Sequence, residues 1–213
     1  MDAIRSRYET HSLGEYQAQL ARVVSRVERI LAPLPIQCHV KHRVKAFDEY
    51  YAKWKGLEGA EEAGIGDMLG VRIICPFLDD LDEVEQALRR QLPIREVERK
   101  GEDHSFREFG YDSIHLQLDL AGETIPHELP GVLPVCEIQL RTILQDAWAE
   151  VEHELIYKSD WSIPTDKIKR KLAALNANLS LSDTIFQELR DFQKEVQHKQ
   201  NRRREIQDTR VRM

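Results

Sequence analysis

Residues 136–158 read CEIQLRTILQDAWAEVEHELIYK and predict a strand that runs directly into a helix. The first residues alternate between polar and apolar, which is typical of a strand with one buried face. Glu137, Gln139 and Arg141 share the polar face, so that an anion, an amide and a cation lie in a row. Thr142, with a glutamine three residues later, has the pattern of a capping box and predicts the helix start. A carboxylate beside a helix start is a suitable place to hold a metal ion and a phosphate.

The rest of the chain alternates between the apolar spacing of helices and that of strands. The predicted helices cover residues 12–31, 47–54, 81–92 and 143–158, and the predicted strands cover 36–44, 71–77, 94–97, 114–120 and 135–141. This order is neither strictly alternating nor all-helical. We therefore expect an α+β fold with a mixed sheet of about five strands, flanking helices and helical extensions at both ends.

A chain of 213 residues is long enough for one domain and marginal for two, so we expect a single domain. Its expected parts are an N-terminal helix at 12–31, a core at 36–158 and C-terminal helices at 164–213 with a frayed end. After Pro164 the sequence carries two stripes of apolar residues at helical spacing, and the second does not continue the phase of the first. Ser180 and Ser182 lie between them and predict a kink or break.

The formal charge of −6 disfavours a generic basic nucleic-acid binder. The cysteines Cys38, Cys75 and Cys136 are scattered without the spacing of a metal site, which indicates reduced thiols. No apolar leader or membrane-spanning run is visible in the sequence. These features predict a cytoplasmic protein with no membrane segment.

Basic side chains alternate on the strand predicted at 36–44. Lys41, Arg43 and Lys45 project from one face, and Lys53 follows on the next helix. Like charges at this spacing repel unless an anion lies between them, so a polyphosphate ligand is one interpretation. A basic edge strand that prevents aggregation is the other, and the cluster alone leaves both open.

A second carboxylate accompanies Glu137. Asp67 begins the segment DMLGVRI, in which Gly70 would let a backbone pass close by and Arg72 is a lone charge among apolar residues. By itself such an aspartate is typical of a turn or cap. Two carboxylates on neighbouring strands are, however, able to share Mg²⁺ together with substrate phosphates.

The hexapeptide GYDSIH at 110–115 lies where a loop enters a strand. Tyr111 could stack on a base and His115 could donate to a phosphate; a core tyrosine and an internally bonded histidine are the alternative. On the helix predicted at residues 143–158 we expect Trp148 to pack in the core. Glu152 and His153 are expected to orient neighbouring groups rather than to act directly.

Together these segments resemble the synthetase domain of the RelA/SpoT alarmone family over about residues 40–158. The matching segments are KHRVK, DMLGVRI, GYDSIH, EIQLRT and WAEVEHELIYK. The length leaves no room for the hydrolase and regulatory domains of the long members. The chain therefore resembles a small alarmone synthetase with the family's nucleotidyltransferase-like fold.

The resemblance implies a Mg²⁺-dependent GTP diphosphokinase that transfers pyrophosphate from ATP to the ribose 3′-hydroxyl of GDP or GTP. The products would be AMP and ppGpp or pppGpp, the alarmones of the stringent response. For ATP, the resemblance assigns Arg43 and Arg72 to the adenine and Lys45 and Lys53 to the phosphates. Such a transfer depends on positioning and charge neutralisation more than on covalent chemistry.

For catalysis, the resemblance assigns Asp67 to Mg²⁺ and Glu137 either to Mg²⁺ or to the base near the 3′-hydroxyl. The acceptor nucleotide would be contacted by Tyr111, His115, Gln139, Arg141 and Arg107. The resemblance also implies a homo-oligomer, with a tetramer favoured, that assembles through the terminal helices.

The segment ahead of Tyr111 departs from the family pattern. Many members are lysine-rich there, whereas here Arg107 is the only comparable cation and Asp112 adds an acid. This departure leaves two alternatives open. One is a family toxin that pyrophosphorylates the 3′-end of tRNA, which the net negative charge disfavours. The other is an alarmone-binding module without turnover, which the retained Asp67 and Glu137 disfavour.

Overall fold

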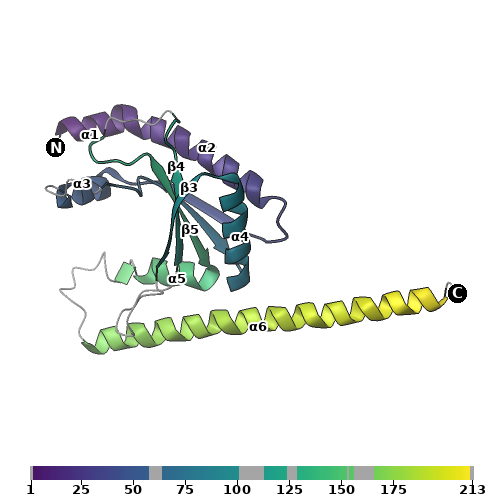
Figure 1. Ribbon diagram of the computed structural model, residues 1–213. Helices are drawn as coiled ribbons and strands as arrows, with labels where there is room; N and C mark the ends of the chain where they lie inside the picture. The colour runs from purple at the N-terminus through teal and green to yellow at the C-terminus, as the bar shows by residue number, and fades with distance from the viewer. Residues whose placement is uncertain are drawn as a thin grey trace.

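The computed structural model describes residues 2–57, 64–100, 113–123, 129–152, 154–155 and 166–211. Its strands are β1 (His39–Val44), β2 (Leu69–Cys75), β3 (Ile94–Lys100), β4 (Ser113–Asp119) and β5 (Val135–Thr142). They form one sheet in the order β1-β2-β5-β4-β3, seen at the centre of Figure 1. β2 and β5 are parallel and the other neighbours antiparallel, so the predicted mixed five-stranded sheet is confirmed.

The helices are α1 (Asp2–Arg7), α2 (Leu13–Leu31), α3 (Phe47–Gly56), α4 (Leu78–Gln91), α5 (Ile143–Glu152) and α6 (Asp166–Val211). A π-helical turn, Tyr8–Ser12, joins α1 to α2, so the N-terminal helix begins earlier than predicted. β1 is shorter than predicted, because it begins at His39 rather than at residue 36.

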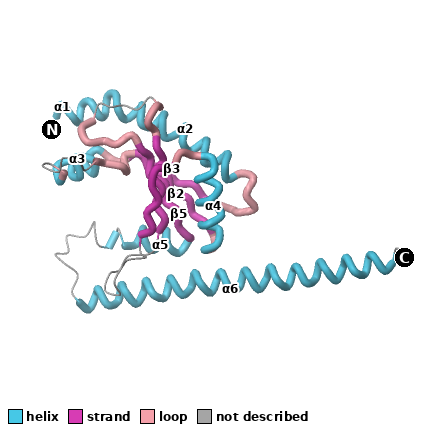
Figure 2. The backbone as a smooth tube through the Cα atoms, viewed as in Figure 1, coloured by secondary structure: helices cyan, strands magenta, loops and turns pink. Residues whose placement is uncertain are grey.

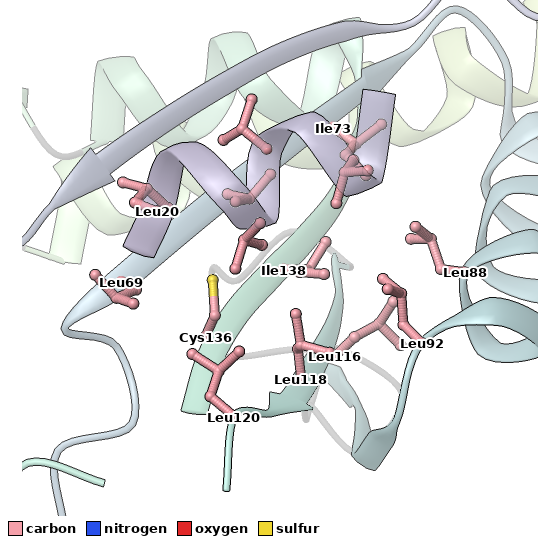
Figure 3. Packing of buried hydrophobic residues seen from close by; sticks show 14 of the residues in the cluster. Leu20, Leu69, Ile73, Leu88, Leu92, Leu116, Leu118, Leu120, Cys136 and Ile138 are labelled. Atoms are coloured by element: carbon pink, nitrogen blue, oxygen red, sulfur yellow. The ribbon is translucent and has the colours of Figure 1, made fainter. Parts of the chain in front are cut away.

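The two faces of the sheet differ in chemistry. One face carries the apolar members of each alternating strand and is covered by α2 and α4 (Figure 3). Ile73, Leu116 and Ile138 are completely buried there. The opposite face carries the polar members, so the alternation that forms the core also collects the charged side chains of β1, β2 and β5 on one surface.

The predicted capping box forms at the junction of β5 and α5. The Thr142 backbone N–H donates to Gln145 Oε1 at 2.8 Å, and the Gln145 N–H donates to Thr142 Oγ1 at 3.1 Å. Trp148 on α5 is 2% exposed and packs in the interior as expected. The cap thus fixes where α5 leaves the sheet.

The predicted break near Ser180 and Ser182 is wrong, because α6 is one continuous helix (Figure 2). Each serine hydroxyl donates to the carbonyl four residues earlier, at 3.1 Å for Ser180 and 2.7 Å for Ser182. The hydroxyls are thus bonded to carbonyls of the helix itself, and the helical backbone continues through both serines.

Polar contacts hold α6 against the rest of the fold. Thr142 Oγ1 donates to Asp183 Oδ2 at 2.6 Å, and Arg190 forms an ion pair with the buried Asp80 at the start of α4. Exposed apolar residues lie between and after these contacts along α6: Ile185, Phe186, Leu189, Phe192 and Val196. None of the helices in the described part of the chain is both long and apolar enough to span a bilayer.

Candidate active site

A cavity of about 380 Å³ opens on the polar face over β1, β2 and β5. Its lining residues are Lys41, His42, Arg43, Asp67, Gly70, Val71, Arg72, Glu137, Gln139 and Glu150. The strand register explains the grouping. Arg43 lies opposite Gly70, which lies opposite Glu137, while Lys41, Arg72 and Gln139 form the next row. Residues far apart in sequence therefore form two adjacent rows of polar groups.

Asp67 holds two of the predicted phosphate-binding lysines. Lys45 Nζ lies 2.7 Å from Asp67 Oδ2, and Lys53 Nζ lies 3.0 Å from Oδ1. Burial by itself raises the pKa of Asp67, but the hydrogen bonds and charges of the two lysines outweigh it, and the net pKa is lowered. Asp67 is consequently an anion at neutral pH, in contact with two cations.

Glu137 is held by its neighbours on the sheet. His115 Nδ1 lies 3.0 Å from Glu137 Oε1, and Gln139 Nε2 donates to Oε2 at 2.6 Å. Burial raises the pKa of Glu137, yet these partners lower it overall, against a smaller opposing effect of the Asp67 charge. Glu137 is therefore ionised, oriented and close enough to Asp67 for their charges to interact.

His115 is buried and bonded at both ring nitrogens, since Ser113 Oγ lies 2.9 Å from Nε2. The internally bonded histidine is therefore the arrangement found. The described contacts make His115 a partner of Glu137, and the expected contact with acceptor phosphates stays a prediction.

Arg72 is held by acidic residues of α5 that sequence reasoning did not single out. Its Nη1 donates to Asp146 Oδ1 at 2.7 Å and to Glu150 Oε1 at 2.6 Å. Lys41 Nζ also reaches Asp146, at 2.8 Å. The signal was available: Asp146 and Glu150 are one helical turn apart and so lie on the same face of α5. Only the packing of α5 shows that this face meets Arg72.

The remaining predicted residues take different positions around the cavity. Arg43 lies 3.6 Å from Glu49 and is largely exposed, so its guanidinium is available to a ligand. Arg141 lies deeper, and its Nε and Nη1 have no hydrogen-bond partner among the described residues. Burial and the Arg72 charge lower the Arg141 pKa to about 10. Burial raises the pKa of Glu152, against the opposing charge of Arg141.

Four of the residues considered above lie outside the described residues: Tyr111, Arg107, Asp112 and His153. Their expected roles at the acceptor and as an orienting group therefore remain predictions. Gln139 lines the cavity, and its expected contact with the acceptor nucleotide stays a prediction.

Gly70 differs from the expectation that a neighbouring backbone needs the space. A Cβ built there would lie 3.8 Å from the Arg43 carbonyl oxygen and 3.9 Å from Arg43 Cγ, which are ordinary contacts. The strand alone therefore tolerates a side chain. Because Gly70 lines the cavity between Arg43 and Glu137, the missing side chain leaves space for a ligand instead.

The donor set also bears on a metal ion. Among the described residues no group of three or more histidine, cysteine or acidic side chains is placed to bind one. Mg²⁺ needs only one or two carboxylates when substrate phosphates supply further oxygens. Asp67 and Glu137, both ionised and both lining the cavity, fit that requirement.

Comparison with known proteins agrees with this geometry. The family described as "Region found in RelA / SpoT proteins" matches residues 42–162. The chain is 35% identical over 145 residues to the GTP pyrophosphokinase YwaC of Bacillus subtilis (strain 168), covering 63% of this chain and 66% of that protein. It is 31% identical over 146 residues to the GTP pyrophosphokinase YjbM of the same strain, covering 68% and 67%. The matched part thus spans about two thirds of these relatives.

Solved structures extend the similarity to most of the fold. The crystal structure of small alarmone synthetase 1 from Bacillus subtilis has a TM-score of 0.68 at 27% identity, covering 90% of this chain and 99% of that one. The structure of that synthetase bound to its product pppGpp has a TM-score of 0.67 at 26% identity, covering 87% and 97%. The family match covers more than half of the chain and includes both Asp67 and Glu137. The chain belongs to the RelA/SpoT family.

Proposed function

We propose that the protein transfers pyrophosphate from ATP to the ribose 3′-hydroxyl of GDP or GTP, forming ppGpp or pppGpp and releasing AMP. The observation that carries the proposal is one cavity in which cations from β1 and β2 face two ionised carboxylates. A triphosphate needs the cations, and a weakly acidic hydroxyl needs a nearby base. Relatives named GTP pyrophosphokinase support the same reaction.

In this proposal the lysines on Asp67 act on the ATP phosphates. Lys45 and Lys53 already lie together, 2.7 and 3.0 Å from the Asp67 oxygens, so one carboxylate holds two positive charges at one place. Arg43 and Arg72 stand in neighbouring rows across β1 and β2 and would enclose the adenine. Charge neutralisation and alignment then supply most of the rate enhancement.

Glu137 would receive the proton of the acceptor 3′-hydroxyl. Its lowered pKa keeps it ionised at neutral pH, and His115 and Gln139 fix its orientation. Asp67 and Glu137 are also the residues that would hold Mg²⁺. When bound, the ion would neutralise charge on the phosphates. If Glu137 were mainly a metal ligand, its basicity would fall, so the two roles compete.

The test is product formation with purified protein, ATP and Mg²⁺, offered GDP, GTP or tRNA as acceptor. We expect ppGpp or pppGpp with the nucleotides, and loss of both in Asp67→Asn and Glu137→Gln variants that remain folded. Label appearing only in tRNA would replace this proposal with the toxin activity. Alarmone binding without any product would indicate a module that has lost turnover.

We further propose that α6 mediates self-association, a tetramer being the expected form. Leu189 is 59% and Phe192 66% exposed, and they lie on either side of Arg190, which pairs with Asp80 of α4. Such a stripe on a long helix is costly to leave in water. Light scattering of the native chain should give an oligomer and Leu189→Glu/Phe192→Glu a smaller species; a native monomer at micromolar concentration would contradict the proposal.

A cytoplasmic location completes the proposal, since all three cysteines are free thiols.

A further inference from the structure

Two cysteines face each other across the strand pair β1–β2. Cys38 directly precedes β1, and Cys75 is the last residue of β2. The antiparallel register pairs His39 with Ile74, so Cys38 and Cys75, one position further along each strand, lie opposite each other. Their sulfur atoms are 3.7 Å apart and are not covalently bonded. Small side-chain rotations suffice to reach the separation of about 2.05 Å found in disulfides.

The two thiols differ in a way that suits stepwise oxidation. Cys38 is partly exposed, whereas Cys75 is completely buried. The hydrogen bond between them lowers the pKa of Cys38, although burial opposes this, and raises the pKa of Cys75, where burial adds to it. The accessible sulfur is therefore the one that more readily becomes the nucleophilic thiolate.

We propose that Cys38 and Cys75 form a modification site: a dithiol that low-molecular-weight disulfides, such as oxidised glutathione, convert to an intramolecular disulfide. The Cys38 thiolate attacks one sulfur of the reagent and expels one thiolate, which leaves a mixed disulfide on Cys38. The Cys75 sulfur then attacks Cys38 Sγ, and the second reagent thiolate leaves with the Cys75 proton. The protein loses two electrons and two protons, and one reagent disulfide becomes two thiols.

The third cysteine is placed where it cannot compete. Cys136 lies in the core (Figure 3), opposite Leu69 in the register of β2 and β5. Leu69 and Cys75 are the two ends of β2, so the rise of a strand places Cys136 about 20 Å from Cys75. The Cys38–Cys75 bond would close the segment 38–75, which contains Lys41, Arg43, Lys45, Lys53, Asp67 and Arg72. Because a bond across such a segment restricts the unfolded chain, the oxidised protein should be more stable.

The experiment incubates the full chain with defined ratios of reduced and oxidised glutathione, followed by intact-mass analysis and peptide mapping. We expect native protein and the Cys136→Ala control to lose two hydrogen atoms, retain no glutathione and yield a linked Cys38–Cys75 peptide. Their Tm should rise on oxidation and return on reduction. Cys75→Ser should keep one glutathione on Cys38, and Cys38→Ser should stay unmodified at Cys75.

Two results would overturn the proposal. One is a native protein that retains glutathione on Cys38 without a bond to Cys75, or links two chains instead. The other is a Cys38→Ser variant whose remaining thiols oxidise as fast as those of the native protein. Mapping the native chain is decisive even if a variant fails to fold. No readout depends on catalysis, so failure here leaves the proposed pyrophosphate transfer untouched.

Discussion

Asp146 Oδ1 lies 2.7 Å from Nη1 of Arg72, so a carboxylate of α5 fixes a guanidinium of β2 at the wall of the cavity. The carboxylate is only 10% exposed, and Lys41 binds its other oxygen. Asp146→Asn should therefore loosen both cations. We expect KM for ATP to rise roughly tenfold, about 1.4 kcal/mol, with a smaller change in kcat.

Glu150→Gln provides the matched control for that substitution. Glu150 contacts the same Arg72 nitrogen at 2.6 Å, but its side chain is 61% exposed. Exposed ion pairs contribute little, so KM for ATP should change less than in Asp146→Asn. If Asp146→Asn leaves KM for ATP unchanged in steady-state kinetics, Asp146 does not position Arg72.

Gly70→Ala should separate folding from ligand binding. The added Cβ meets only ordinary contacts with Arg43, and alanine lowers the entropy cost of ordering the strand, so Tm should stay level or rise. The methyl group would enter the cavity between Arg43 and Glu137. We expect a roughly tenfold rise in KM for ATP. A fall in Tm with unchanged KM would instead support the close-backbone interpretation.

The pH dependence of kcat should report Glu137. Its pKa is lowered from 4.5, so the carboxylate stays ionised until the pH falls below that value, and kcat should be flat down to about pH 5. His115→Asn removes a stabilising partner while burial still raises the pKa. The acidic limb of kcat at saturating substrate should then move to higher pH.

Ser113→Ala is the control for the pH experiment. It removes the partner at His115 Nε2 and leaves the Nδ1 contact with Glu137 in place. The acidic limb should therefore move less than in His115→Asn. If neither variant moves the limb, Glu137 is not the group whose protonation limits the reaction. The stability of the fold should change with pH in the same direction. Because the pKa of Glu137 is lower in the folded state, its ionised form stabilises the fold at pH values above the unfolded-state pKa. This stabilisation is lost as the pH falls through the folded-state pKa.

Thr142→Ala should destabilise the junction of β5, α5 and α6. The hydroxyl accepts from the Gln145 N–H and donates to the buried Asp183, so its removal affects a cap and a buried carboxylate together. We expect the free energy of unfolding to fall by about 2 kcal/mol. Thr142→Ser keeps the hydroxyl and should lose less than about 1 kcal/mol in urea denaturation. Equal losses would point to the missing methyl group instead.

Local sequence patterns predicted the structure correctly where that structure depends only on neighbouring residues. Alternation along residues 135–141 predicted β5, and the spacing of Thr142 and Gln145 predicted its cap, because both depend on neighbouring residues alone. The same holds for the shared face of Lys41 and Arg43. The continuity of α6 could not be predicted this way, because local residues do not show whether a helix bends at a serine. In the structure both serine hydroxyls bond to carbonyls of the same helix, which continues unbroken.

The amino-acid sequence by itself determined the α+β class, the face on which the charges collect and the family motifs that name Asp67 and Glu137. Periodicity and motif spacing are local, so they survive without coordinates. Only the tertiary structure decided which charges meet: Asp67 with Lys45 and Lys53, Glu137 with His115, and Arg72 with the unsuspected Asp146. The reason is that strand order and helix packing bring together residues whose separation along the chain carries no signal of contact.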